Sequence, residues 1–224
     1  MSFARTADDQ GQVANEAFLQ LASATDHFER YDNPHAIRIS RLADEIARRF
    51  QMAVQDRQSL RDAALLHDLG EVAMDRDYIQ RAGTLTEEER IDLSRHPVIG
   101  EQEVARVGAD RAVHLIVRWH HEWWNGSGYP DALSREEIPL AARILRVADS
   151  YAALTDARPF RPAWTAESAR QMIVAGAAIE FDPRVVNVFV SLGSMSELES
   201  FATTEIAAQA GTKREWNLFA SFMK

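Results

Sequence analysis

The chain has 224 residues, a net charge of −9 and no cysteine, and these facts exclude several classes of protein. An acidic chain lacks the basic face that binds nucleic acid, so no DNA or RNA partner is expected. Without cysteine, any metal must be held by nitrogen and oxygen ligands. The opening residues lack the apolar core of a signal peptide, and no apolar run is long enough to cross a bilayer. We therefore expect a soluble cytoplasmic protein that does not contact a membrane.

The first half of the chain shows the periodicity of amphipathic helices. Apolar residues predict helices over residues 12–28, after a polar N-terminal arm, and over residues 34–50. The third predicted helix, residues 56–70, ends at a glycine, which is common at helix C-termini. Thr86 opens a capping-box sequence for the next helix, and Pro97 is expected to kink or restart that helix.

The second half continues in the same way, with no segment that alternates as a strand does. Helices are predicted over residues 110–120, 138–152, 165–178 and 182–192, followed by a helical hairpin or long helix over 194–223. The chain is therefore predicted to be an all-α protein, a compact bundle of about eight helices.

Residue types that bind metals recur on the apolar faces of these predicted helices. A single such histidine is more often a core residue that bonds a backbone carbonyl, but the repetition favours a shared site. Buried imidazoles and carboxylates are costly unless they are paired or bind a metal. This many donors suits two ions bridged by a carboxylate and a water-derived hydroxide. The inward-facing residues are His35, His67, Asp68, His96, His120, His121 and Asp149.

Short motifs connect these residues to a known family. In chain order they are His67-Asp68-x-Gly, His96-Pro97, His120-His121-Glu122, Gly126-Ser127-Gly128-Tyr129-Pro130, Ala148-Asp149 and Arg158-Pro159-Phe160-Arg161. This order and spacing resembles the HD-GYP group of HD-superfamily phosphohydrolases, from about Pro34 to about Phe189. The resemblance implies a helical domain around a buried metal site. It also implies hydrolysis of the bacterial messenger cyclic di-GMP, to a linear dinucleotide or to GMP.

The same resemblance implies roles for individual residues. The seven inward-facing residues fall at family ligand positions, and two divalent ions are expected, iron or manganese first and zinc as the alternative. Asp68 is the residue expected to bridge the two ions. Substrate contacts are expected from Gly128, Tyr129, Arg158 and Arg161, although Tyr129 could instead pack under its turn and Arg161 could be solvated.

Three positions depart from the family pattern. Glu71 stands where the family motif has lysine, Tyr31 where some members carry an acid that recruits a third metal, and Ala152 where many have an aspartate. A carboxylate at position 71 either repels the anionic substrate or adds a ligand, so Glu71 joins Asp68 as a candidate catalytic residue. The tyrosine favours two ions over three.

Three functions remain open from the sequence. The first is a cyclic-dinucleotide phosphodiesterase. The second is a weakly active or inactive module that binds nucleotide and metal and signals through protein partners, such as a diguanylate cyclase or a sensor protein, or as a homodimer. The third, a nucleotidase acting on mononucleotides, is disfavoured by the turn at residues 126–130 and by the pair Arg158 and Arg161. The domain prediction is an N-terminal arm and helix (1–30), the phosphohydrolase domain (31–192) and a C-terminal helical extension (193–224).

Overall fold

The computed structural model describes residues 7–157 and 162–193, with side chains from Glu16 on. The chain divides into two units, Met1–Ser191 and Leu192–Lys224, and the second lies almost wholly outside the described residues. The described residues form α-helices, one 3₁₀ helix (η1) and no β-strand, which confirms the all-α prediction. The elements are α1 (Ala7–Phe28), α2 (His35–Arg49), α3 (Val54–Leu66), α4 (Leu69–Met74), α5 (Asp77–Gln80), α6 (Glu87–Leu93), α7 (His96–Arg106), α8 (Arg111–Trp119), η1 (Arg135–Glu137), α9 (Leu140–Thr155), α10 (Ala166–Ala175) and α11 (Pro183–Ser191).

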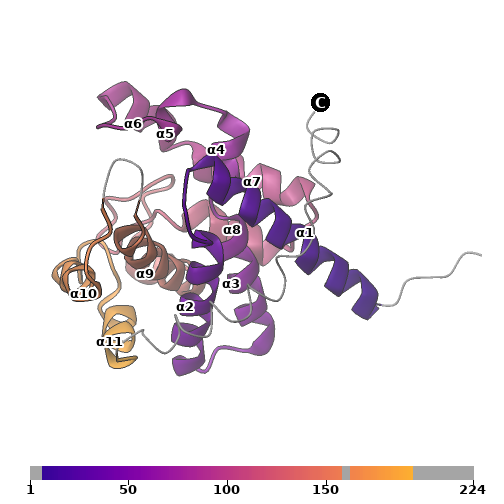
Figure 1. Ribbon diagram of the computed structural model, residues 1–224. Coiled ribbons are helices and arrows are strands. Elements are labelled where there is room, and N and C mark those ends of the chain that lie inside the picture. Colours follow the sequence, from indigo (N-terminus) through magenta and orange to yellow (C-terminus); the bar gives the residue numbers. More distant parts are fainter. Residues whose placement is uncertain (1–6, 158–161, 194–224) are drawn as a thin grey trace, which may run out of the picture. The chain divides into compact units, whose positions relative to one another are not determined.

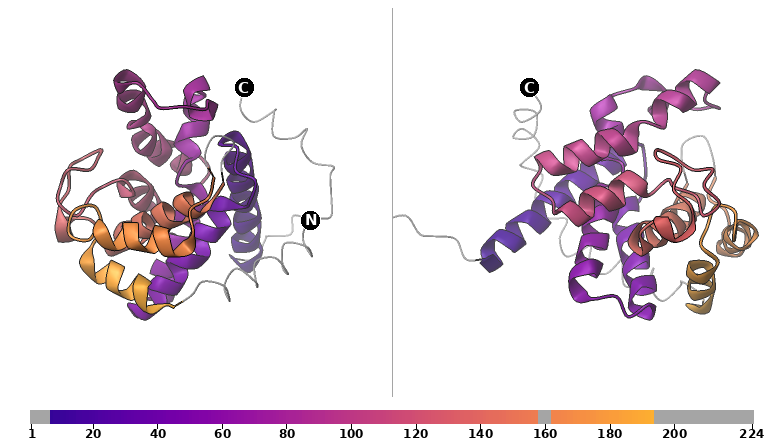
Figure 2. Two further views of the ribbon diagram at one scale, coloured as in Figure 1. Left: turned by 60° about the vertical axis from the view of Figure 1, so that its left-hand side comes forward. Right: turned by 180° about the vertical axis from the view of Figure 1, so that it is seen from behind.

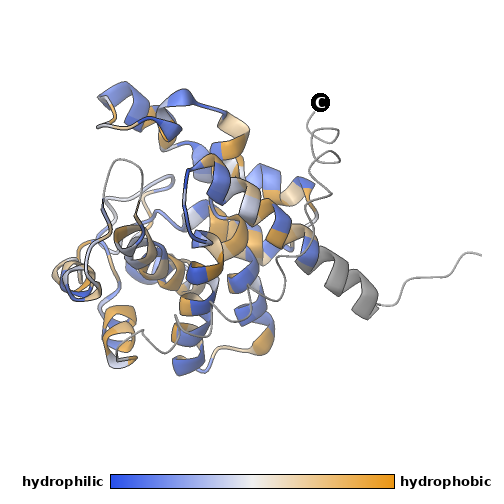
Figure 3. Ribbon diagram, in the orientation of Figure 1, coloured by the Kyte–Doolittle hydropathy of each residue, from blue (hydrophilic) through white to orange (hydrophobic). Residues whose placement is uncertain are grey.

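Four helices of the first unit, α2, α3, α8 and α9, form its core (Figure 1). Helix α2 packs on α3 and α9, and α8 packs on the same two helices; Figure 2 shows this arrangement from two further directions. Each helix carries both hydrophobic and hydrophilic residues (Figure 3), as expected when only one side of a helix is buried. Fully buried side chains on the inner faces include Ile39, Leu60, Val117 and Leu145. Most of the predicted ligands lie at or next to helix ends, whereas Asp149 lies within α9.

Gly70 does not end a helix, so that prediction was wrong. Helix α3 stops at Leu66 and α4 starts at Leu69, which places the glycine inside α4. A Cβ atom at Gly70 would lie 2.1 Å from the His96 carbonyl oxygen and 2.7 Å from the Gly100 nitrogen. The missing side chain therefore serves close packing of α4 on α7, rather than a left-handed turn.

Several other boundaries fall close to those predicted. Thr86 and Glu89 form the expected capping box of α6, and Pro97 lies in the first turn of α7, which restarts the helix as expected. The helix predicted from Gln12 begins earlier, at Ala7. Helices α4 and α5 are too short to show a period of their own, so the described residues form eleven α-helices rather than about eight. The predicted hairpin at residues 194–223 lies outside the described residues.

Candidate metal centre and active site

The seven residues predicted as metal ligands converge in two groups. His35 and His96 each begin a helix, His67 and Asp68 join α3 to α4, and His120 directly follows α8. Within each group, the candidate ligand atoms all lie within 4.8 Å of one another. The four-ligand group is Asp68, His96, His120 and His121, and the three-ligand group is His35, His67 and Asp149.

Asp68 lies between the two groups. Its Oδ2 atom is 2.8 Å from Nε2 of His67, a member of the three-ligand group. Its Oδ1 atom is 3.3 Å from Nε2 of His96 and 3.6 Å from Nε2 of His120, both in the four-ligand group. One carboxylate thus presents a different oxygen to each group, which is the arrangement that a bridging ligand requires.

The backbone fixes the orientation of three imidazole rings. Nδ1 of His67, His96 and His120 each lies 2.6–3.1 Å from the carbonyl oxygen of the residue three positions earlier. A ring that donates at Nδ1 keeps its lone pair at Nε2, and such partners are typical of metal-bound histidines. In all three rings the Nε2 atom faces Asp68. The last turns of α3, α6 and α8, which carry these carbonyl groups, therefore set the orientation of the three rings.

The donor atoms fit a bound cation. Among the described residues, Nε2 of His35 is buried and has no hydrogen-bond partner, and Nε2 of His67 and Oδ1 of Asp68 make no hydrogen bond of ordinary geometry although other polar atoms lie 2.8–3.3 Å away. The Nε2 atoms of His96 and His120 lie 3.3 Å apart, so neutral rings held at Nδ1 direct two lone pairs at each other. Such an arrangement is repulsive unless a cation or a proton lies between the rings. Nitrogen and oxygen donors without sulfur suit iron, manganese or zinc.

Charges inside the site shift the protonation of the ligands. Burial lowers the pKa of His67, but the Asp68 carboxylate outweighs it and raises that pKa to about 10. Burial disfavours an ionised Asp68, yet His67 and the neighbouring rings hold the Asp68 pKa well below its usual value. Burial, His120 and Arg146 lower the pKa of His121 far below its usual value. Asp68 is therefore a carboxylate and His121 a neutral imidazole at neutral pH, whereas His67 must lose a proton to bind a metal.

Glu71 reaches the site from α4 together with Glu29, an acid that was not predicted. Glu29, Asp68 and Glu71 offer oxygens within 4.8 Å of one another. Burial and the Asp68 carboxylate raise the pKa of Glu71 to about 7, and Glu71 is hydrogen-bonded to Glu29. Two carboxyls that share a proton do not require a cation between them. Position 31, where some members of the family carry an acid, holds a tyrosine here. The Tyr31 ring stacks on the His35 ring, with centroids 3.8 Å apart.

The Gly126–Pro130 turn packs directly on the ligands. Gly128 has no room for a side chain, since a Cβ atom there would lie 2.2 Å from the Trp123 nitrogen. The Tyr129 ring stacks on His121, with centroids 4.9 Å apart and planes 19° from parallel. Packing on a ligand is thus the contact seen for Tyr129, and substrate contacts from Tyr129 and Gly128 stay predictions.

A pocket of about 340 Å³ opens beside the two groups. This volume lies within the range of small-molecule sites. One wall is apolar and includes Leu154, Ile173 and Phe181. Arg158 and Arg161, predicted to contact substrate, lie outside the described residues. The polar wall consists of Asp68, Glu71, His121, Arg146, Asp149 and Glu180 with their neighbours.

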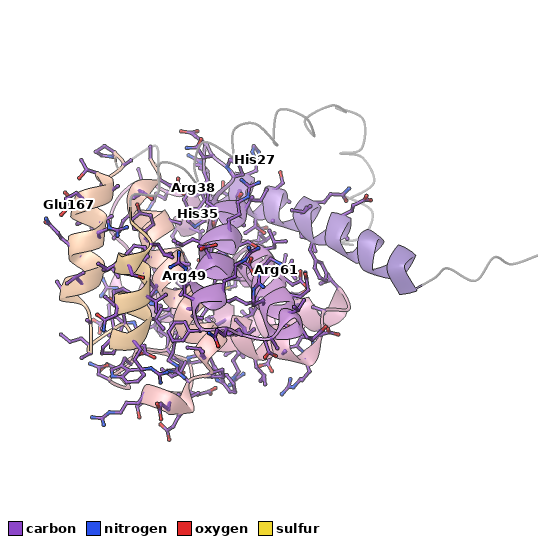
Figure 4. The ribbon with its side chains drawn as sticks, turned by 90° about the horizontal axis from the view of Figure 1, so that it is seen from below. His27, His35, Arg38, Arg49, Arg61 and Glu167 are labelled. Atoms are coloured by element: carbon purple, nitrogen blue, oxygen red, sulfur yellow. The ribbon has the colours of Figure 1, made fainter. Side chains whose placement is uncertain are left out.

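Asp156 was also not predicted, although it orients a candidate ligand. Its Oδ2 atom lies 2.7 Å from Nδ1 of His35, and its Oδ1 atom accepts a hydrogen bond from Arg38. Figure 4 shows His35 and Arg38 close together on α2. A signal was available in the sequence, because Asp156 follows Asp149 by seven residues, about two helical turns. The His35 ring therefore has its Nδ1 atom occupied and its Nε2 atom directed at the site.

Arg146 is the third unpredicted residue of the site. It lies one turn before Asp149 in α9, and its Nη1 atom is 3.1 Å from Nδ1 of His121 and 3.6 Å from Oδ2 of Asp149. Its Nη2 atom donates to Glu180. Nothing in the sequence indicated the contact with His121, because a single arginine in a helix usually faces solvent.

Comparison with known proteins shows which family the chain belongs to. The family model described as "HD domain" matches residues 14–185 of the chain. The chain belongs to the HD domain family. The resemblance to the HD-GYP group is confirmed, because the curated proteins similar to this chain are named as cyclic-dinucleotide phosphodiesterases.

Two curated relatives illustrate the match. "Cyclic di-GMP phosphodiesterase response regulator RpfG" of Xanthomonas campestris pv. campestris (strain 8004) is 36% identical over 182 residues, which is 78% of this chain and 47% of that protein. "3'3'-cGAMP-specific phosphodiesterase 2" of Vibrio cholerae serotype O1 is 28% identical over 185 residues, which is 81% of this chain and 35% of that protein. The HD domain chain thus spans about half or less of the length of these relatives.

A solved structure supports the fold. The structure titled as a cyclic GMP-AMP specific phosphodiesterase of V. cholerae, V-cGAP3, has a TM-score of 0.66 at 20% identity. The match covers 87% of this HD domain chain and 52% of that chain. At this identity the likeness concerns the helical fold alone.

Proposed function

We propose that this protein is a metal-dependent phosphodiesterase that cleaves a cyclic dinucleotide to a linear dinucleotide or to GMP. The observation that supports this most strongly is the position of Asp68, between two groups of imidazole ligands and at the wall of a pocket. The names of its relatives divide between cyclic di-GMP and 3'3'-cGAMP. Cyclic di-GMP is the first choice, because the more similar of the two relatives carries that name.

Each ligand group is proposed to hold one divalent ion, iron or manganese first and zinc as the alternative. Bound dications neutralise the charge of a phosphodiester and lower the pKa of water toward neutral. Asp68 would contribute one oxygen to each ion. A third ion is not proposed at Glu29 and Glu71, because the raised pKa of Glu71 lets these two carboxyls share a proton in place of a cation.

The remaining residues of the pocket position the substrate. Leu154, Ile173 and Phe181 form an apolar wall beside the ligand groups, which suits the flat face of a nucleobase. Arg158 and Arg161 are proposed to contact phosphate and base, since a guanidinium both donates in pairs and stacks. On the ligand side of the pocket, His35, His67 and His96 are buried.

Turnover of metal-loaded protein tests the proposal. Purified protein loaded in turn with iron, manganese and zinc would be incubated with cyclic di-GMP and with 3'3'-cGAMP, and products separated by chromatography. Cleavage by wild type, and none by Asp68→Asn, is the expected result. Fully loaded wild type that leaves both cyclic dinucleotides intact would contradict the proposal.

Glu71 favours one alternative, a weakly active module that binds nucleotide and signals through protein partners. Its carboxyl lies in the pocket, near Asp68, where it opposes an anionic substrate once it ionises. A large gain of turnover in Glu71→Lys, with a smaller gain in Glu71→Gln, which only removes the negative charge, would support that alternative. Protein partners, a homodimer and the predicted domain boundaries stay predictions.

Location is likewise a prediction. No helix within the described ranges, 7–157 and 162–193, has both the length and the apolar character needed to cross a membrane. The cytoplasmic location expected from the sequence would place the protein in the compartment of its proposed substrate.

A further inference from the structure

The charged side chains that line the pocket beside the two ligand groups are mostly acidic. A phosphodiester is an anion, and the acidic side chains on this wall repel it until cations offset them. Among the described residues that line the pocket, Arg146 is the single lysine or arginine. The acidic residues that line it are Glu29, Asp68, Glu71, Asp149 and Glu180.

Arg146 is anchored at one edge of its guanidinium group. Its Nη2 atom donates to the Glu180 carboxylate. Its Nη1 atom lies 3.1 Å from Nδ1 of His121 and 3.6 Å from Oδ2 of Asp149, and the second distance is too long for a hydrogen bond. Its buried Nε atom has no acceptor within the described part of the chain. An arginine that served only as a structural ion pair would have its Nε donor satisfied as well.

The contact between Arg146 and His121 has a chemical consequence. A guanidinium only donates, so Nδ1 of His121 accepts the hydrogen bond and the neutral ring carries its proton at Nε2. Such a ring has no lone pair left for a metal ion. The hydrogen bond from Arg146 and metal coordination by His121 are therefore alternatives. If His121 coordinated a metal ion, the Nη1 donor would be released beside the site while Glu180 still held Nη2.

We propose that Arg146 is a substrate-binding residue whose Nη1 atom, released by His121, donates to a non-bridging oxygen of the phosphodiester. The inference rests on the proposed function, because it takes a phosphodiester as the ligand of this pocket. It assigns to α9 the cationic contact that position 71, a glutamate, does not supply.

Phosphate binding tests this without turnover. Inorganic phosphate would be titrated calorimetrically into manganese-loaded wild type, Arg146→Met and Arg146→Lys, at metal occupancies fixed by elemental analysis. Loss of one charge-assisted hydrogen bond predicts phosphate affinity about 10- to 100-fold lower in Arg146→Met. Arg146→Lys should lose less phosphate affinity than Arg146→Met, because lysine keeps the positive charge but not the paired donors. Manganese affinity should stay equal or rise in Arg146→Met, since the competing hydrogen bond is gone.

Arg143→Met is the matched control. Arg143 lies one turn earlier in α9 and donates to Asp182 at 2.5 Å, but it is not among the residues that line the pocket. Its replacement should leave phosphate affinity within about twofold of wild type. If that variant does not fold, Arg118→Met replaces it, since Arg118 pairs with Asp131 and Glu101 outside the pocket.

Two results would overturn the inference. One is wild-type phosphate affinity in Arg146→Met at equal metal occupancy. The other is a parallel loss of manganese and phosphate, which would mean that Arg146 only supports the ligands. Because phosphate binding needs no cleavage, a protein that never cleaves a cyclic dinucleotide could still show the predicted effect. The proposed function and the role of Arg146 can therefore fail separately.

Discussion

Nδ1 of His35 lies 2.7 Å from Oδ2 of Asp156, although 121 positions separate the two residues in the chain. Both side chains are almost fully buried, and Nε2 of His35 lies 3.9 Å from Oδ1 of Asp149. The carboxylate at the end of α9 thus sets the orientation of a ligand at the start of α2. Partners of this kind strengthen metal binding by fixing the ring and its tautomer.

Asp156→Ala should lower metal affinity about 10- to 100-fold, because His35 loses the group that orients it. Asp156→Asn should lose less metal affinity than Asp156→Ala, since its amide oxygen can still accept a hydrogen bond from Nδ1 of His35. Competition with a calibrated chelator measures both. Asp92→Ala, which removes a surface partner of Arg76, is the control. Unchanged metal affinity in folded Asp156→Ala would show that His35 does not depend on Asp156.

Gly70→Ala should destabilise the fold by about 1–3 kcal/mol, because the added Cβ forces α4 away from α7. The same displacement should weaken metal binding, since Asp68 precedes α4 and His96 begins α7. Urea denaturation and metal titration measure the two effects. In Gly100→Ala the new Cβ meets a side-chain atom of Val117 at 3.1 Å, which can shift, so the cost should be smaller. Equal costs for the two variants would contradict the packing argument.

The stability of the protein should depend on pH through Asp44, far from the pocket. Asp44 accepts hydrogen bonds from Arg57 and Arg61 at 2.8–2.9 Å. Burial opposes its ionisation, but these arginines lower its pKa below the ordinary value of 3.8. Because the folded-state pKa is the lower one, the carboxylate stabilises the fold above 3.8, and this contribution is lost as pH falls through the folded value.

Asp44→Asn should therefore lower the free energy of unfolding by about 1–2 kcal/mol at neutral pH. The difference from wild type should shrink as pH falls from about 5 toward the folded-state pKa of Asp44, which lies below 3.8, because the unfolded chain binds this proton first. Urea denaturation at several pH values in this range measures the free energy of unfolding of both proteins. Subtracting one pH curve from the other removes the contribution of the carboxylates that the two proteins share. A difference that stays constant with pH would rule out the charge of Asp44 as its source.

Metal removal should lower the melting temperature. An ion that binds the native state alone, at 100 times its dissociation constant, stabilises the fold by about 2.7 kcal/mol. Calorimetric melts with and without a chelator test this, and restored metal should restore the transition. Asp68→Ala, which lacks the residue between the two groups, should respond much less to the chelator. Identical melts of loaded and stripped wild type would mean that no ion binds the native fold appreciably.

The convergence of the candidate ligands could be predicted because its signal is local. Each of His35, His67 and His120 extends a helical apolar stripe, and an imidazole in that place needs a partner. The two-group arrangement follows once those helices pack. Gly70 was misjudged because a glycine that ends a helix and a glycine that allows two helices to touch look alike in the sequence.

The unpredicted residues depend on contacts between distant segments. Arg146 and Glu180 lie 34 positions apart, and neither stands out on its own helix or turn. Glu29 follows the last turn of α1, where an acid is unremarkable until α4 brings Glu71 beside it. Such pairs follow from the packing of whole helices, which periodicity does not specify.

Elemental analysis of the purified protein tests the central claim most directly. Convergence of His35, His67, His96, His120 and His121 on two carboxylates predicts two transition-metal ions for each chain. Asp68→Ala should retain markedly less metal, because both groups lose a ligand. Wild-type protein that contains no stoichiometric metal, and takes up none when iron, manganese and zinc are offered, would contradict the account.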